Sequence, residues 1–144
     1  MYKTILVATD GSELSDKAVD QAIGLAGKLG AKLVGVTVRR PFDAMFVEGM
    51  VIEVPESVRQ QVLESVKATL EGLGSKAKAA GVSCETISMT HAFPWEAILE
   101  AAKQKSADLI VMASHGRRGV SALLIGSETQ KVLSHGKVPV LVVR

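Results

Sequence analysis

The chain has 144 residues and a mass of 15.2 kDa, which fits one domain with a proper core. Hydrophobic residues make up 47% and charged residues 22%, a balance typical of a globular protein and not of a disordered one. Aromatic residues are only 3%, which argues against single-stranded nucleic-acid binding because such binding needs stacking platforms. The formal charge of +2, from 17 Lys and Arg against 15 Asp and Glu, is too small for a DNA-binding surface.

Cysteine content and apolar run lengths exclude further classes. Cys84 is the single cysteine, so an intrachain disulfide and a cysteine-based metal cage are both excluded. No stretch approaches the roughly 18 apolar residues that a membrane span requires. The apolar run that begins at Ile5 lacks the architecture of a signal peptide. We therefore expect a cytoplasmic protein that has neither nucleic acid nor a membrane as its partner.

The first predicted elements are a strand, a turn and a helix. Residues 5–8 form a short apolar run that ends in the turn-and-cap cluster of residues 9–12. From Leu14 to Leu29, apolar residues recur at three-and-four spacing, which predicts an amphipathic helix stopped by Gly30.

A second strand is expected over 31–38, and periodicity then breaks over residues 39–55, with a proline near each end. This stretch is longer than a typical connection between a strand and a helix, and such loops are often functional or mobile. The alternative is that its apolar residues pack on the sheet edge. Both interpretations stay open.

The second half of the chain continues the alternation. Pro94 suits the first turn of a helix, where its missing N–H is not needed. Short, uniformly apolar strands that alternate with helices predict an α/β fold with a parallel sheet, in one domain over residues 1–144. The elements expected after residue 55 are a helix over 56–80, a strand over 82–89, a helix from Pro94, a strand over 109–113, a helix from Gly126-Ser127 to Leu133, and a strand over 138–143.

Two segments stand where such a sheet binds ligands, beyond the carboxyl ends of its strands. Residues 8–12 follow the first strand, and residues 113–127 follow the fourth. Glycines in the second segment let the backbone approach a ligand, and the helix that follows offers free N–H groups and partial positive charge, with Ser127 as its expected cap. The segments carry neither a Walker lysine nor a dinucleotide fingerprint, so an ordinary tight turn and helix cap is the alternative.

Together and in this order, residues 5–12, 107–119, Gly126-Ser127 and 138–143 resemble the universal stress protein family over essentially the whole chain. The ATP-binding branch of that family carries a glycine, two residues, a glycine, nine residues, and a glycine followed by Ser or Thr. Gly116 and Gly126-Ser127 fit this pattern, and Ala113 stands at the first glycine position. The resemblance implies a doubly wound, Rossmann-like sheet of five parallel strands in the order 3-2-1-4-5.

The resemblance also implies an ATP site, with or without Mg²⁺, which would bridge phosphate oxygens and need few protein ligands. Asp10 would accept hydrogen bonds from the ribose hydroxyls or lie beside the adenine. Ala8, Thr9 and Val38 would line the adenine pocket, and Met112 would contact the base or sugar. Backbone groups of Ala113, His115, Gly116 and Gly126, with Ser127 and Thr129, would hold the phosphates. Arg117 and Arg118 are weaker candidates for phosphate contact. The implied nucleotide-binding residues are Ala8, Thr9, Asp10, Val38, Met112, Ala113, His115, Gly116, Gly126, Ser127, Glu128 and Thr129.

Several alternatives remain at this point. Asp10 could cap the first helix instead of binding a ligand, and Trp95 could either pack at a helix start or narrow a groove. The favoured function is a nucleotide-responsive homodimeric module in the stress response, paired through the edge strand 138–143 because exposed edges are usually covered. A slow ATPase is the competing function, although no general base or Walker lysine is evident. A third is an interaction protein that dimerises without nucleotide. Its protein partner cannot be identified from the sequence.

Overall fold

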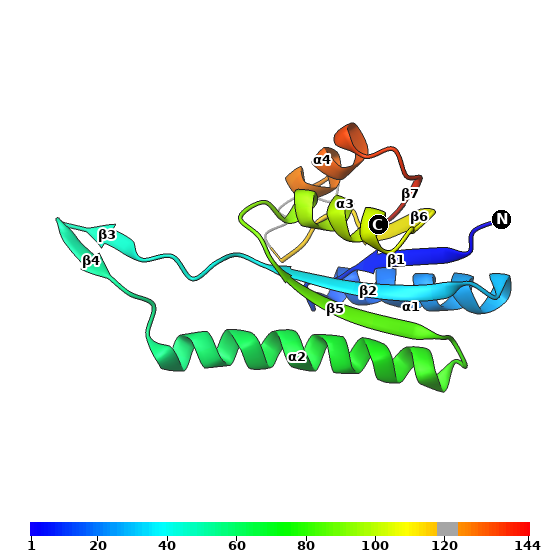
Figure 1. Ribbon diagram of the computed structural model, residues 1–144, viewed down its shortest axis with the longest axis horizontal. Coiled ribbons are helices and arrows are strands. Elements are labelled where there is room, and N and C mark those ends of the chain that lie inside the picture. The colour runs from blue at the N-terminus through cyan, green and yellow to red at the C-terminus, as the bar shows by residue number, and fades with distance from the viewer. Residues whose placement is uncertain (118–123) are drawn as a thin grey trace.

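The computed structural model describes residues 1–117 and 124–144, and its main feature is a five-stranded parallel sheet (Figure 1). Its strands lie in the order β5-β2-β1-β6-β7. Counted along the chain within this sheet, that is the predicted order 3-2-1-4-5, which is confirmed. The strands are β1 (Thr4–Ala8), β2 (Lys32–Arg39), β5 (Cys84–Thr90), β6 (Leu109–Ala113) and β7 (Val140–Val143).

Helices cover both faces of this sheet, as expected for a doubly wound fold (Figure 1). Helices α1 (Glu13–Leu29) and α2 (Glu56–Ala79) pack on one face, and α3 (Pro94–Gln104) and α4 (Ser127–His135) on the other. Successive strand residues alternate between two buried clusters, so that Ile5 belongs to the α1 side and Leu6 to the α3 side. Within the described ranges, no helix combines the length and hydropathy needed to cross a bilayer.

The ends of α1 follow from local chemistry. Ser12 is the N-cap, and its hydroxyl accepts a hydrogen bond from the Ser15 N–H at 3.3 Å. Gly30 ends the helix at φ +65°, a left-handed conformation that costs glycine little. The predicted stop at Gly30 is therefore confirmed, and the alternative that Asp10 caps this helix is wrong.

The long connection after β2 forms a hairpin that stands away from the body (Figure 1). Its strands are β3 (Met45–Val47) and β4 (Met50–Ile52), paired antiparallel. Their six side chains are 42–79% exposed. The alternative that these apolar residues pack on the sheet edge is therefore wrong.

Helix α2 reaches the sheet through a single large side chain. Leu73 and Ala77 are its buried residues. Leu73 lies over Gly35 of β2, where a Cβ would come within 2.6 Å of Leu73 Cδ1. Glycine at position 35 thus lets α2 approach the strand closely.

Candidate functional site

Two adjoining cavities lie at the carboxyl ends of β1 and β6, where the order of the sheet reverses. The inner cavity measures about 210 Å³ and the outer about 450 Å³. They share Asp10, Val38 and the first turn of α4 as walls. Their sizes suit a small-molecule ligand.

The inner cavity is mainly apolar and lies on the α3 side of the sheet. Most of its apolar walls come from the strand ends and from α3, within the buried cluster of that face. These walls are Ala8, Val36, Val38, Ile98 and Met112. A flat, uncharged group would find apolar contact here.

The outer cavity is more polar than the inner one and carries both signs of charge. It is lined by two arginines, two carboxylates and the start of α4. The polar side chains are Asp10, Arg40, His115, Arg117, Ser127, Glu128 and Thr129. An anionic group extending from the inner cavity would reach these residues.

The Asp10 carboxylate joins the turn after β1 to the loop after β6. Its Oδ1 accepts the Ser12 N–H at 2.9 Å, and its Oδ2 accepts the Arg117 N–H at 3.0 Å. The Arg117 Nε–H donates in turn to the Asp10 carbonyl at 3.1 Å. Burial raises the pKa of Asp10, but hydrogen bonds from Ser12, Ser15 and Arg117 outweigh burial, so the pKa lies below its ordinary value. Asp10 is therefore an anion that accepts hydrogen bonds at neutral pH.

The first turn of α4 faces the outer cavity without a side-chain cap. Gly126 is the N-cap, and Ser127 is the first helical residue, so the prediction that Ser127 caps this helix is wrong. The Gly126 N–H donates to the Ser114 carbonyl at 2.6 Å, which occupies one backbone donor expected for a ligand. The N–H groups of the next residues belong to the helix start, where intrahelical acceptors are lacking.

Thr129 holds this helix to the end of β6. Its buried hydroxyl donates to the Ala113 carbonyl at 2.9 Å. The hydroxyl thus has a partner within the protein and fixes the start of α4 beside the carboxyl end of β6.

Glu128 lies in the same first turn and reaches a second helix. Its Oε2 accepts the Trp95 N–H of α3 at 2.9 Å, so a carboxylate from α4 satisfies the start of α3. Trp95 packs in the buried cluster and lies 4.5 Å from the His135 ring, centroid to centroid. Trp95 does not line either cavity, which agrees with packing at a helix start and not with narrowing of a groove.

Ala113 turns its methyl group away from α3 and α4. Along β6, Met112 belongs to the cluster on the α3 side and Ala113 to the cluster on the α1 side. Most apolar walls of the inner cavity belong to the α3 side, whereas Ala113 lines the cavity from the α1-side cluster. The methyl that replaces a glycine in the pattern therefore packs with the α1-side cluster and not with the α3-side walls.

The structure brings all twelve predicted nucleotide-binding residues to these two cavities. Sequence reasoning missed five further walls: Ser15, Val36, Arg40, Pro94 and Ile98. Two signals could have found some of them, because Val36 shares a strand face with Val38 and Pro94 lies one helical turn before Ile98. Arg118 and Gly119 lie outside the described residues.

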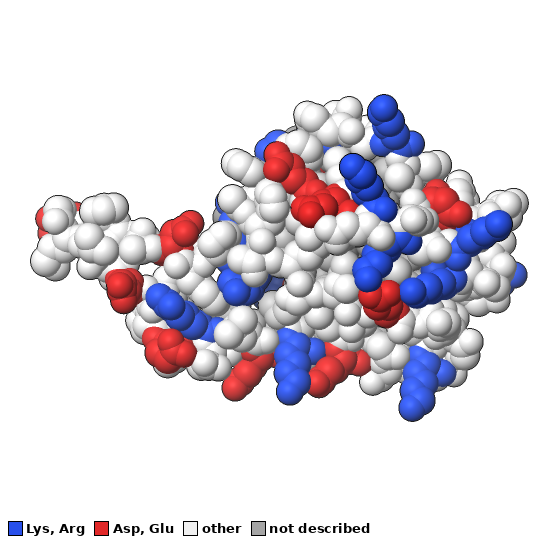
Figure 2. Space-filling model, in the orientation of Figure 1, with Lys and Arg blue, Asp and Glu red and all other residues white. Residues whose placement is uncertain are grey.

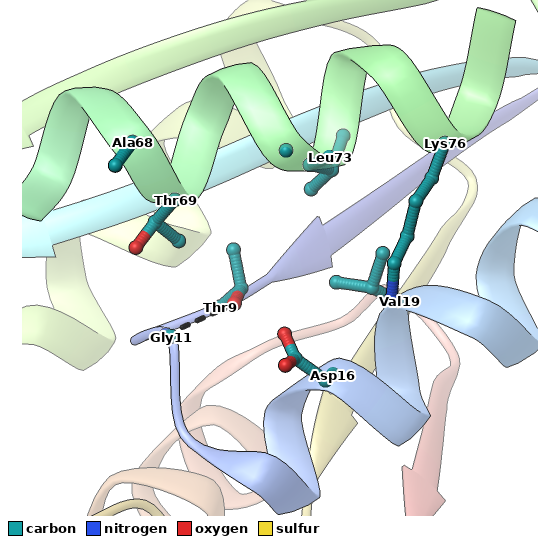
Figure 3. Close-up of a pocket in the computed structure, with 9 residues that line it drawn as sticks. Thr9, Gly11, Asp16, Val19, Ala68, Thr69, Leu73 and Lys76 are labelled. Carbon is teal, nitrogen blue, oxygen red and sulfur yellow. Dashed lines mark hydrogen bonds between the residues drawn. The ribbon is translucent and has the colours of Figure 1, made fainter.

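A separate groove of about 310 Å³ lies on the other side of the turn after β1, between α1 and α2 (Figure 3). Thr9 lines both this groove and the inner cavity. Asp16 and Lys76 point into the groove from the two helices (Figure 3), and Lys76 Nζ pairs with Asp20 at 2.9 Å. The Thr9 hydroxyl accepts the Gly11 N–H at 3.2 Å and lies 3.1 Å from the Ser15 hydroxyl. The Thr9 hydroxyl and the Lys76 ammonium thus have partners within the protein.

Metal and thiol chemistry find no support in the part of the chain that the structure describes. No group of three or more His, Cys, Asp and Glu is placed there to hold a metal ion. Cys84 is half-buried against the α1-side cluster, and burial raises the pKa of its thiol. Cys84 thus packs as a small apolar residue.

The family model of the universal stress protein family matches residues 1–144. The chain belongs to this family. The universal stress protein YxiE of Bacillus subtilis is 36% identical over 151 residues, and the match covers 100% of both chains.

Solved universal stress proteins share the fold. One from Burkholderia pseudomallei has a TM-score of 0.78 and 27% identity, covering 99% of this chain and 96% of that one. Another, solved in complex with cAMP, has a TM-score of 0.74 and 30% identity, and the match covers 99% of this chain and 97% of that one. The α/β universal stress protein fold is thus established for this chain.

Proposed function

We propose that this universal stress protein binds an adenine nucleotide, with the base in the inner cavity and the phosphates in the outer one. The observation that carries the proposal is the change of lining, from apolar strand ends to the polar start of α4. The Asp10 carboxylate accepts hydrogen bonds from the ribose hydroxyls, and the first turn of α4 supplies N–H donors to the phosphates. The structural relative with cAMP supports an adenine nucleotide as the ligand class.

The proposed ligand is ATP. Arg40 and Arg117 line the outer cavity and offset phosphate charge. Mg²⁺, if bound, would be held mainly by the nucleotide phosphates and would need few protein ligands. The Ala113 methyl faces the α1 side, so this departure from the glycine pattern is compatible with binding.

Ligand-dependent thermal unfolding tests this proposal. ATP, ADP, AMP and cAMP are each added with and without Mg²⁺ to the native chain, to Gly116→Val and to Asp10→Ala. A ligand that binds only the folded state stabilises it by about 2.7 kcal/mol at a hundredfold excess over Kd. We expect a shift with ATP that Gly116→Val and Asp10→Ala lose and that the distant carboxylate variant Asp43→Ala keeps. No shift at millimolar concentration of any of the four would contradict the proposal.

We further propose that the protein acts as a cytoplasmic homodimeric regulator, paired through the open edge of β7. The Pro139 and Val143 carbonyls accept from β6, so the Val142 N–H points to the open edge. Val142→Pro removes that donor while sparing the ladder to β6. Sedimentation should show a smaller assembly for Val142→Pro, because the edge contact is lost, and the native mass for Val142→Ala, which keeps the contact.

A further inference from the structure

The hairpin and its two stems, residues 41–55, form what we call the arm. Figure 2 shows the arm as a projecting lobe of uncharged and acidic residues. Phe46 is 79% exposed, Met50 67% and Met45 63%. With roughly 100 Å² for each of six such side chains, the arm exposes about 600 Å² of apolar surface, at the upper end for a monomer. An isolated two-stranded hairpin is marginal in water, so we expect a partner to cover it.

The base of the arm is held in a set direction. The Arg39 guanidinium lies 4.5 Å from the Phe42 ring centroid, and that of Arg59 lies 5.8 Å from it on the same ring. Arg59 Nε–H also donates to the Val54 carbonyl at 3.1 Å, which ties the second stem to α2. The arm therefore leaves the body from a fixed base and presents its apolar residues outward.

Charge separates the arm from the rest of the chain. The arm contains Asp43, Glu48 and Glu53 and no Lys or Arg. The chain carries +2 and the arm −3, so the remainder carries +5. An acidic arm is repelled by anionic lipid and by nucleic acid. A second copy of this chain offers a basic complement instead, with Arg39, Arg40 and Arg59 at its own arm base.

We propose that the arms of two copies pair antiparallel across a two-fold axis, with the Glu48 tip of one beside the Arg40 base of the other. A two-fold arrangement makes each tip-to-base contact twice and buries the apolar residues of both arms between them. The roughly 600 Å² of each arm approaches the ~800 Å² per partner of a standard interface. This interface is separate from the β7 edge and requires no nucleotide.

Sedimentation of two variants beside the native chain tests the pairing. Phe46→Asp combined with Met50→Asp should lower the mass of the assembly, because buried charge opposes the contact. Val142→Pro, which blocks only the β7 edge, should still sediment as an arm-paired dimer. The proposal would be overturned if the arm variant kept the native mass or if the Val142→Pro protein were monomeric. Neither outcome would decide whether the chain binds nucleotide or pairs through the β7 edge. Flotation of the native chain, but not the arm variant, with phosphatidylglycerol vesicles would overturn it in favour of a membrane.

A charge exchange then tests the geometry. Glu48→Lys alone and Arg40→Glu alone should each weaken the dimer by several-fold, because each places like charges at the tip-to-base contact. The two together should restore most of the native dissociation constant. Additive weakening in the double variant would overturn the antiparallel arrangement, and misfolding cannot imitate restoration.

Discussion

The Asp10 carboxylate occupies the space that a side chain at Gly116 would need. A Cβ built on Gly116 would lie 2.6 Å from Asp10 Oδ2. Gly116 does not have a positive φ, so space and not backbone conformation requires glycine here. Gly116, which matches the nucleotide-binding pattern, is thus needed to leave room for the Asp10 carboxylate.

Gly116→Ala should therefore displace Asp10 and break its hydrogen bonds to Ser12 and Arg117. We expect a loss of about 1–3 kcal/mol in the free energy of unfolding, as for other overpacked sites, and weaker nucleotide binding. Urea unfolding and calorimetric titration measure the two effects. Gly24→Ala is the matched control, because nothing lies within 4 Å of its Cβ and helical alanine is favoured by about 0.5–1 kcal/mol.

Combining Gly116→Ala with Asp10→Ala isolates the contact. Removing the carboxylate also removes the clash, so the double variant should be more stable than the sum of the single changes predicts. Additivity within about 0.5 kcal/mol would show that the two residues do not interact.

Thr129→Val tests the link between α4 and β6. The change keeps the shape of the side chain but leaves the buried Ala113 carbonyl without its donor. We expect a loss of about 1–3 kcal/mol in urea unfolding. Thr129→Ser keeps the hydroxyl and should lose less. Equal stability of the valine variant and the native chain would refute this role.

Gly35→Ala tests the close approach of α2 to β2. The added methyl meets Leu73, and we expect a cost of about 1–3 kcal/mol. Hydrogen exchange should rise along α2 and remain unchanged in α3, which packs on the opposite face. Adding Leu73→Val should recover part of the loss, and failure to recover any would indicate that the strand itself is strained.

Asp108 provides a pH-dependent contact between β1 and β6. Burial raises the pKa of Asp108. Hydrogen bonds of 2.9–3.1 Å from the N–H groups of Lys3 and Thr4 lower the pKa by more than burial raises it, so the net shift is downward. A lowered folded-state pKa stabilises the protein above the unfolded value of about 3.9, and this stabilisation is lost as pH falls through the lower folded value. Asp108→Asn should therefore differ from the native chain most at neutral pH, and the gap should narrow below about pH 4.

Unfolding free energies of both chains at pH 7, 5 and 3 measure that gap. A difference that stays constant down to pH 3 would contradict the proposed linkage.

The α/β class with a parallel sheet was predictable from the residues because buried parallel strands are short and uniformly apolar. The strand order and the nucleotide-site residues followed instead from the resemblance to the universal stress protein family. The same rule did not decide between the two interpretations of residues 39–55, where the apolar residues Met45–Val47 and Met50–Ile52 lie outside the body. Hydrophobicity indicates that a side chain needs cover, but it does not specify whether the cover comes from the same chain.

Capping was predictable at α1 and not at α4. Ser12 satisfies the usual rule, whereas Gly126 takes the N-cap position at α4. A Cβ on Gly126 would lie 3.1 Å from His115 Cα, so close packing decides that position and moves Ser127 into the helix. The bond from Glu128 to Trp95 joins residues 33 apart, and no local pattern signals such a contact.

The central position of β1 has a consequence for synthesis. The first strand pairs with β2 within the first 40 residues, but its other edge pairs with β6 only after residue 109 has been made. Asp10 and Arg117 are likewise 107 residues apart in sequence. At roughly 5–20 residues per second, several seconds separate the emergence of the two halves from a ribosome. During that interval the nascent chain carries an uncovered central strand, which makes this stage a natural substrate for chaperones.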